Sequence, residues 1–195
     1  PSLGTARSAT VLYDMLMRGF TTLRDAAGAD LGHKQAVEEG HFIGPRLFVA
    51  GRSISQTGGH GDHRVRADQS EPCACVHLGP GIGRVADGIS EVRRAVRDEI
   101  RLGADQIKIM ASGGIASAAD PIDQLQYSME EMEAIVDEAA RSNTYVMAHA
   151  YPDAAIRRCT EAGVRTIEHG NLLGPDTAKL MAERGTYLVP TLVAF

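Results

Sequence analysis

Short apolar runs alternate with segments of helical periodicity along the whole chain. The last three runs begin at Thr144, Val164 and Thr186, so one strand and one helix recur roughly every twenty residues. Parallel strands need a helical crossover of this kind, and the alternation therefore predicts an α/β fold with a parallel sheet. Six strands are expected, at residues 20–24, 46–50, 106–110, 144–148, 164–168 and 186–190.

Six helical segments accompany these strands. The run Ser128–Glu131 has the pattern of a capping box, Pro152 suits the first turn of the next helix, and Gly163 suits its end. The stretch from Gly51 to about Gly83 lacks any such pattern and predicts one long loop rich in Gly, Pro, Asp and His. A loop of this length in a compact domain is usually functional.

Two architectures fit repeated βα units with right-handed crossovers: an open doubly wound sheet and a closed barrel. No glycine-rich dinucleotide fingerprint follows the first strand. Residues suited to chemistry follow several strands instead of gathering after one, which favours a TIM-like (βα)8 barrel with its active site at the C-terminal strand ends.

Lys108 lies between Ile107 and Ile109 in an apolar strand, and the chain has three lysines in all. A buried, unpaired ammonium is costly and tends to lose its proton. A neutral amine can capture CO2 as a carbamate, which can bridge two metal ions. His149 and His169 follow at the ends of the next two strands, and neutral imidazole is a good metal ligand. Lys108, His149 and His169 are therefore candidate metal ligands.

Each of these residues also has a structural interpretation. Lys108 could pair with a buried carboxylate, and each histidine could hydrogen-bond a backbone carbonyl. His60 lies in the glycine-flanked run Gly58–Asp62, where the backbone can approach a ligand closely, and is a candidate for substrate binding. His63 in the same loop fits a solvated position.

Tyr151 directly follows His149 and could donate its hydroxyl to a substrate anion, although packing alone would also explain it. Asp25, at the end of the first strand, suits helix capping or support of the site. The other histidines are expected to be surface groups; they are His33, His41 and His77.

The overall composition is that of an ordinary globular domain, with 44% hydrophobic and 23% charged residues in 195. The net charge of −5 gives no reason to expect nucleic acid or an anionic membrane as a partner. Cys73 and Cys75 lie in the long loop and Cys159 on a helix. This odd count without a framework suggests reduced thiols and a cytoplasmic protein.

Five segments resemble the amidohydrolase superfamily, and in particular its prolidase-like and imidazolonepropionase-related branch. They are Gly19–Asp25, Gly58–Asp62, Ile107–Gly114, Ala148–Tyr151 and Ile167–Asn171. The resemblance implies a distorted (βα)8 barrel with two divalent metal ions, usually zinc. Lys108 would be the carboxylated lysine that bridges them, and His149 and His169 would be ligands.

The resemblance also implies that residues 1–195 are a partial barrel domain running from helix 1 to strand 7. Strand 1, with a His-x-His pair, would precede Pro1. Strand 8, with the aspartate that acts as general base, would follow Phe195, so no catalytic acid–base residue is expected within this segment. The usual small β-sandwich domain would lie outside it too.

The function implied is a metal-dependent hydrolase that cleaves amide bonds of dipeptides or N-acyl amino acids with a free C-terminal carboxylate. An Xaa-Pro dipeptidase or carboxypeptidase is the leading interpretation, with His60 and Tyr151 binding that carboxylate. The alternatives are a cyclic-amide hydrolase of the imidazolonepropionase type and a non-catalytic barrel remnant. We expect a homo-oligomer with a small-molecule or dipeptide substrate and no nucleic-acid or membrane partner.

Overall fold

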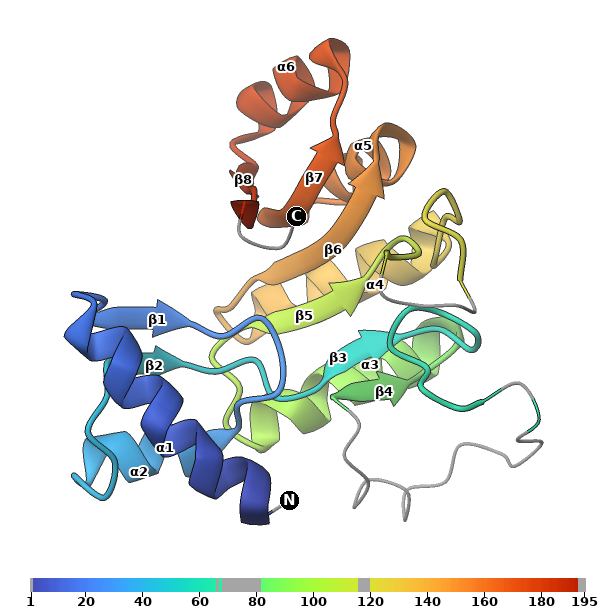
Figure 1. The fold of residues 1–195 in the computed structure, drawn as a ribbon. Helices are drawn as coiled ribbons and strands as arrows, with labels where there is room; N and C mark the ends of the chain where they lie inside the picture. The colour runs from blue at the N-terminus through green and yellow to red at the C-terminus, as the bar shows by residue number, and fades with distance from the viewer. Residues whose placement is uncertain (1, 66, 68–81, 116–119, 193–195) are drawn as a thin grey trace.

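A computed structural model describes residues 2–65, 67, 82–115 and 120–192 of the chain, and every strand and helix expected from the sequence is present (Figure 1). The helices are α1 (Ser2–Met17), α2 (Leu31–Glu38), α3 (Gly88–Arg101), α4 (Met129–Arg141), α5 (Asp153–Glu161) and α6 (Pro175–Arg184). The strands are β1 (Thr22–Arg24), β2 (Arg46–Phe48), β3 (Ser53–Ser55), β4 (Gly83–Val85), β5 (Ile107–Met110), β6 (Val146–Pro152), β7 (Thr166–Leu172) and β8 (Tyr187–Val189).

The described strands pair in parallel throughout, which confirms the α/β prediction. One sheet has the order β4-β3-β5-β6-β7-β8, and β1 pairs with β2 in a second, two-stranded sheet. The two sheets are joined where β2 leads into β3. There, the backbone N–H of Asp105 donates to the Val49 carbonyl at 2.8 Å, and the Val49 N–H donates to the Asp105 carboxylate at 2.8 Å. β2 and β3 are thus two ends of one interrupted strand.

The prediction of a single long loop from Gly51 to about Gly83 is wrong near its start, because β3 lies there, and the strand β4 that follows the loop was not expected. The Ser-Ile-Ser sequence of β3 has little apolar character, yet Ser53, Ile54 and Ser55 are all buried. This segment is a strand because it pairs with β4 on one side and β5 on the other, and no local sequence pattern predicts it. Cys73, Cys75 and His77 lie outside the described residues.

The contacts of the Arg24 side chain show that the sheet is curved. Arg24 on β1 donates to Thr166 (3.0 Å) and Glu168 (2.8 Å) on β7, and it also contacts the sulfur of Met147 on β6. In a flat sheet, four strand spacings would separate β1 from β7, roughly 19 Å, which one arginine side chain cannot span. The strands therefore form an arc with Arg24 on its concave face, as in a barrel.

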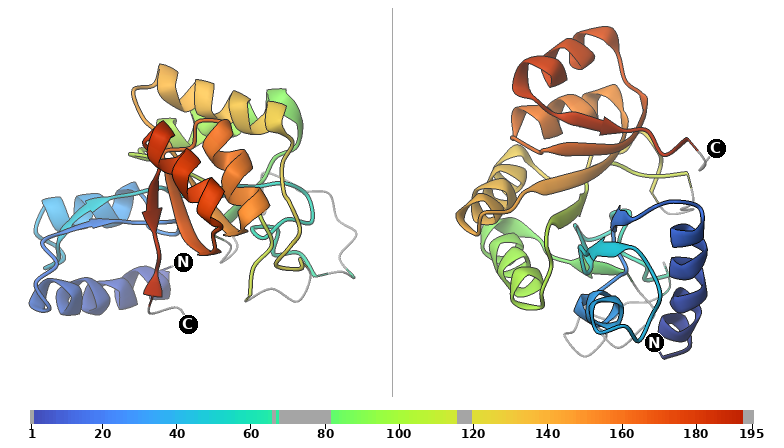
Figure 2. Two further views of the ribbon diagram at one scale, coloured as in Figure 1. Left: turned by 90° about the horizontal axis from the view of Figure 1, so that it is seen from above. Right: turned by 90° about the vertical axis from the view of Figure 1, so that its left-hand side faces the viewer.

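Alternation along the strands divides the residues between the two faces of this arc. Ile107 and Ile109 on β5 and Ile167 on β7 belong to the main apolar core, together with buried residues of α3, α4 and α5. Figure 2 shows helices α3, α4, α5 and α6 in succession along this outer side of the sheet. Lys108, between the two isoleucines, is left on the concave face.

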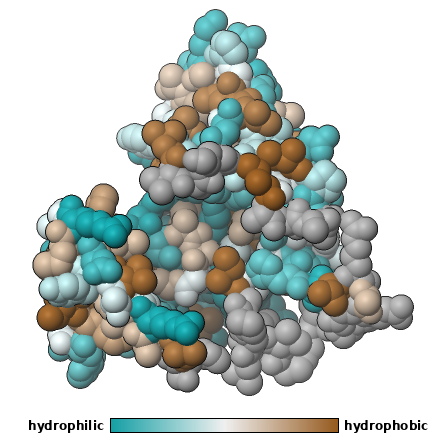
Figure 3. All heavy atoms as spheres, in the orientation of Figure 1, coloured by the Kyte–Doolittle hydropathy of each residue, from teal (hydrophilic) through white to brown (hydrophobic). Residues whose placement is uncertain are grey.

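Exposed apolar side chains lie on or next to the strands at the two ends of the arc. Phe20 precedes β1, Tyr187 and Leu188 lie on β8, and Leu172 ends β7; each is at least 40% exposed. Figure 3 shows apolar surface over the β7–β8 region. In a closed barrel, further strands would cover such edges. Within the part of the chain that the structure describes, no helix is long and apolar enough to cross a membrane.

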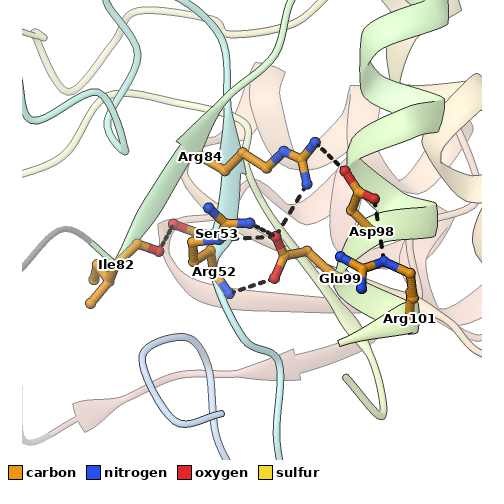
Figure 4. Close-up of polar contacts among 7 residues, drawn as sticks. All are labelled: Arg52, Ser53, Ile82, Arg84, Asp98, Glu99 and Arg101. Atoms are coloured by element: carbon orange, nitrogen blue, oxygen red, sulfur yellow. Dashed lines mark hydrogen bonds and ion pairs between the residues drawn. The ribbon is translucent and has the colours of Figure 1, made fainter. Parts of the chain in front are cut away.

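A buried carboxylate fixes the break between β2 and β3. Glu99 on α3 is 2% exposed and accepts hydrogen bonds from the backbone N–H and guanidinium of Arg52 and, at 3.5 Å, from Arg84 on β4 (Figure 4). Gly51 lies at the bend with φ +66°, and a Cβ there would be 2.7 Å from the Glu99 carboxylate. Glu99 thereby ties α3 to β4 and to the start of β3.

Replacing Glu99 by alanine in the full-length protein should lower the free energy of unfolding by about 3–5 kcal/mol, because two guanidinium groups lose a buried partner. Urea denaturation measures the effect. Arg101→Ala is the control, since Arg101 pairs with Asp98 at 3.7 Å and its side chain is 70% exposed, so its midpoint should stay close to that of the unmodified protein. Equal midpoints for both variants would show that the buried cluster adds nothing.

Candidate active site

Lys108 is 3% exposed on the concave face of β5. Among the described residues, no hydrogen bond or ion pair engages its ammonium group. Burial lowers the pKa of Lys108 to about 8, with Glu168 opposing the shift. The alternative in which Lys108 pairs with a buried carboxylate is not realised, because Glu168 accepts instead from Arg24 (2.8 Å) and Thr166 (2.7 Å). At neutral pH a fraction of this amine is uncharged and nucleophilic.

His149 lies on β6, beside Met110 of β5, on the same face as Lys108. It is 4% exposed, and its Nε2 lies 3.1 Å from the Gly113 carbonyl oxygen. This is the backbone contact that the structural interpretation expected, and it requires Nε2 to carry the proton. Burial, followed by the charge of Lys108, lowers the pKa of His149 to about 2. The ring is therefore neutral, with Nδ1 as its lone-pair nitrogen.

His169 reaches the same cluster through an unusual backbone conformation. It pairs with Ala150 in the β6–β7 register, one position beyond the pair of His149 and Glu168, so regular alternation would turn it toward the other face. Its φ of +77° breaks that alternation, next to a register shift between Ala150 and Pro152. The His169 ring centroid lies 4.8 Å from that of His149. A non-glycine residue in this region is strained, and such strain concentrates at functional sites.

The environment of His169 also fixes its protonation. Nδ1 lies 2.7 Å from the hydroxyl oxygen of Thr191, just after β8. Burial lowers the pKa of His169 to about 4, with Lys108 as the second cause. The imidazole is therefore neutral near pH 7, and Nε2 is available when Nδ1 donates to Thr191.

His60 lies closer to the predicted metal ligands than the sequence suggested. Its ring stacks on that of His149, with centroids 4.3 Å apart and an interplanar angle of 16°. Its Nδ1 lies 2.8 Å from a carboxylate oxygen of Asp120. His63, three residues on, is exposed. No sequence pattern pointed to Asp120, because its role depends on two loops meeting in space.

Tyr151 completes the group of rings. Its ring stacks on His169 at 4.9 Å and meets His149 edge-on at 5.0 Å. Its backbone N–H donates to the Ser112 hydroxyl at 3.1 Å, which ties β6 to the loop after β5. Burial raises the pKa of Tyr151, so its hydroxyl is a proton donor at neutral pH.

The donor atoms fit metal binding. His149 and His169 each use one ring nitrogen in a hydrogen bond and keep the other available, which is the arrangement by which metal-ligating histidines are oriented. Within the described ranges, no three His, Cys, Asp or Glu side chains form a group that could hold a metal by themselves. Lys108 and residues beyond those described would therefore have to complete a metal site.

Other sequence-predicted positions have structural roles. The Asp25 carboxylate accepts from the backbone N–H groups of Ala27 and Ala29 and stabilises a turn, so it does not cap α2. Asp30 caps that helix in a capping box with His33, which is more than a surface group. His41 is exposed, as expected. Cys159 lies on α5 in the core, as a free thiol.

The chain is similar to a known protein family and to characterised proteins. The model of the amidohydrolase family matches residues 1–195. Ochratoxinase from Aspergillus niger is 38% identical over 198 residues, which covers 98% of this chain and 41% of the relative. The chain thus spans less than half the length of the curated relatives it matches.

Two solved structures extend the comparison. The crystal structure of a prolidase complexed with N-methylphosphonate-L-proline is 59% identical, with a TM-score of 0.94 over 98% of this chain and 47% of that chain. The structure of an Xaa-Pro dipeptidase with bound methionine in the active site is 35% identical, with a TM-score of 0.83 over 97% of this chain and 46% of that chain.

The lowered pKa of Lys108 predicts a pH-dependent stability of the metal-free protein. Between pH 8 and the ordinary lysine value of 10.5, the unfolded chain binds a proton that the folded chain does not. The free energy of unfolding should therefore rise with pH in this window, by at most about 1.4 kcal/mol per pH unit. Urea unfolding at a series of pH values measures the slope.

Lys108→Met should remove this contribution to the slope. Lys179→Met should retain it, since the Lys179 side chain is 76% exposed on α6. Parallel pH profiles for the unmodified protein and Lys108→Met would mean that the lysine titrates normally in the folded state.

Proposed function

This chain belongs to the amidohydrolase family, and we propose that it forms the core of a metal-dependent hydrolase acting on amide bonds. The proposed substrates are dipeptides of the Xaa-Pro type or N-acyl amino acids with a free C-terminal carboxylate. One observation carries the proposal: two neutral histidines, each oriented by a hydrogen bond through one nitrogen, lie in ring contact on the face that carries the buried Lys108.

Lys108 supports the proposal through its chemistry. The neutral amine can attack the carbon of CO2 and release a proton, which gives a carbamate with one negative charge. This reaction replaces a poorly solvated cation by an anionic oxygen ligand. A pKa of about 8 makes the neutral amine available at physiological pH. The two oxygens of the carbamate would then suit a bridging position between two metals.

Members of the superfamily generally use divalent metal ions, and zinc is our expectation here. Such ions, when bound, supply an acidified water molecule and a Lewis acid for the scissile carbonyl. On this chain, His149 would contribute Nδ1 and His169 would contribute Nε2. The His-x-His pair and the aspartate that acts as general base are expected outside these 195 residues.

The similar structures support the substrate class. The prolidase that is 59% identical was solved with a compound containing an L-proline unit, and a second similar structure is an Xaa-Pro dipeptidase. Tyr151 and His60 lie in ring contact with the two histidines, which supports a role for both in contacting a substrate. We propose that they bind its terminal carboxylate. A cytoplasmic location and a homo-oligomeric state stay predictions.

Lys108→Ala in the full-length protein should remove most of the bound metal, because the carbamate ligand cannot form. Elemental analysis of the purified protein measures metal per chain. Lys179→Ala is the matched control and should leave the content unchanged. Unchanged metal in Lys108→Ala would exclude the bridging role, and a full-length protein without metal would favour a non-catalytic binding role.

Amidating the C-terminus of an alanyl-proline substrate should raise KM strongly and lower kcat/KM, because the proposed anion contact is lost. Steady-state kinetics on the free acid and the amide make the comparison. Turnover of both compounds at equal kcat/KM would rule out recognition of the carboxylate while leaving amide hydrolysis itself intact.

A further inference from the structure

Asp120 is a buried carboxylate whose position stands out beside the histidine cluster. It is 2% exposed and lies in the segment between β5 and α4. Within the described part of the chain, its side chain has a single hydrogen-bond partner, the Nδ1 of His60 at 2.8 Å. Burying a carboxylate is costly unless it is paired. The hydrogen bond to His60 therefore explains how Asp120 can be buried.

The ring of His60 is held by more than Asp120. Its backbone N–H donates to the side-chain oxygen of Gln126 at 3.0 Å, and the next N–H, of Gly61, donates to the Ser55 hydroxyl at 3.1 Å. Gly114 lies directly against the ring, since a Cβ at this position would clash with Cε1 of His60. β3 and the segment between β5 and α4 therefore fix where this ring lies.

The pairing also settles which nitrogen of His60 is available. With Nδ1–H donating to the Asp120 carboxylate, Nε2 is left for another partner. No hydrogen bond of Nε2 occurs among the described residues. The His60 ring stacks on the ring of His149, whose Nε2 donates a hydrogen bond to the Gly113 carbonyl. Nε2 is consequently the nitrogen of His60 that can serve a ligand in the cluster, beside Nδ1 of His149, which is the proposed metal ligand.

We propose that Asp120 is a positioning residue for substrate binding, which acts by fixing the orientation of His60. This inference rests on the proposed function, in which His60 binds the terminal carboxylate of the substrate. The carboxylate of Asp120 accepts a hydrogen bond from Nδ1–H, and the protonated ring then presents Nε2–H as a donor to the substrate carboxylate. Asp120 itself does not contact the substrate.

A double-mutant cycle in the full-length, metal-loaded enzyme tests the inference, with free-acid alanyl-proline as the probe. Asp120→Ala should lower kcat/KM about 10–100-fold, the usual cost of losing a residue that orients a binding group. The loss should fall mainly on KM, because the carboxylate is bound equally in the ground state and the transition state. Metal content should not change.

The decisive comparison is with His60→Ala. Once His60 is removed, the further change Asp120→Ala should cost little, because the two residues act as one unit. The amidated substrate should be nearly insensitive to Asp120→Ala. Asp123→Ala is the matched control, since Asp123 lies three residues away on the same segment and is exposed; its kinetics should be unchanged.

Two further variants guard against misfolding. Asp120→Asn retains an oxygen that can accept from Nδ1 and should lose less activity than Asp120→Ala. In the His60→Ala background, Asp120→Asn should cause no further loss of kcat/KM. Gly114→Ala displaces the His60 ring directly and should raise KM in the same way.

Additive losses for Asp120 and His60 would overturn the inference, since they would show that Asp120 acts independently of the ring. Loss of activity in His60→Ala with none in Asp120→Ala would also overturn it, while leaving the proposed function standing. Unchanged kinetics in His60→Ala would contradict the proposed role of His60 and, with it, the inference.

Discussion

The ion pair between Arg24 and Glu168 joins distant strands across the concave face of the sheet. Glu168 is nearly buried, and its 2.8 Å contact with Arg24 requires β1 and β7 to approach through curvature. The same pair bears on the charge of Lys108, because Glu168, the carboxylate that most opposes the lowering of the Lys108 pKa, is already engaged by Arg24. A buried lysine without its own counter-ion is then left with a lowered pKa. The curvature of the sheet and the reactivity of the lysine thus depend on one contact.

The histidine cluster shows how orientation and protonation are set together. His149, His169 and His60 each have one nitrogen bonded, to Gly113, Thr191 and Asp120 respectively. Burial keeps His149 and His169 neutral. Neutral, oriented imidazoles are what a divalent metal requires. Gly113 and Asp120 lie in the segment between β5 and α4, and Thr191 follows β8, so the site depends on how these two segments meet the loop that carries His60.

The strained backbone of His169 also helps to bring the histidine rings together. A regular strand would have placed this ring on the helix-facing side, where Ile167 packs in the core. A positive φ, supported by the Thr191 hydroxyl and by stacking on Tyr151, redirects it into the cluster. The cost of such a conformation is of order 1–3 kcal/mol. This cost is tolerated where the four rings of His60, His149, Tyr151 and His169 converge.

The parallel α/β arrangement follows from the amino-acid sequence alone, because strand and helix periodicities alternate visibly and right-handed crossovers leave few topologies. The sequence also singled out Lys108, His149 and His169, since a lysine between isoleucines and histidines at strand ends are local signals. Other features were decided by tertiary contacts alone. β3 is a strand because its neighbours pair with it, and its serines carry no apolar pattern. Asp120 meets His60 across sixty residues of chain, and Arg24 meets Glu168 across a longer interval. Periodicity reports which face a residue takes within one element, whereas such encounters depend on how the sheet curls and how its loops pack.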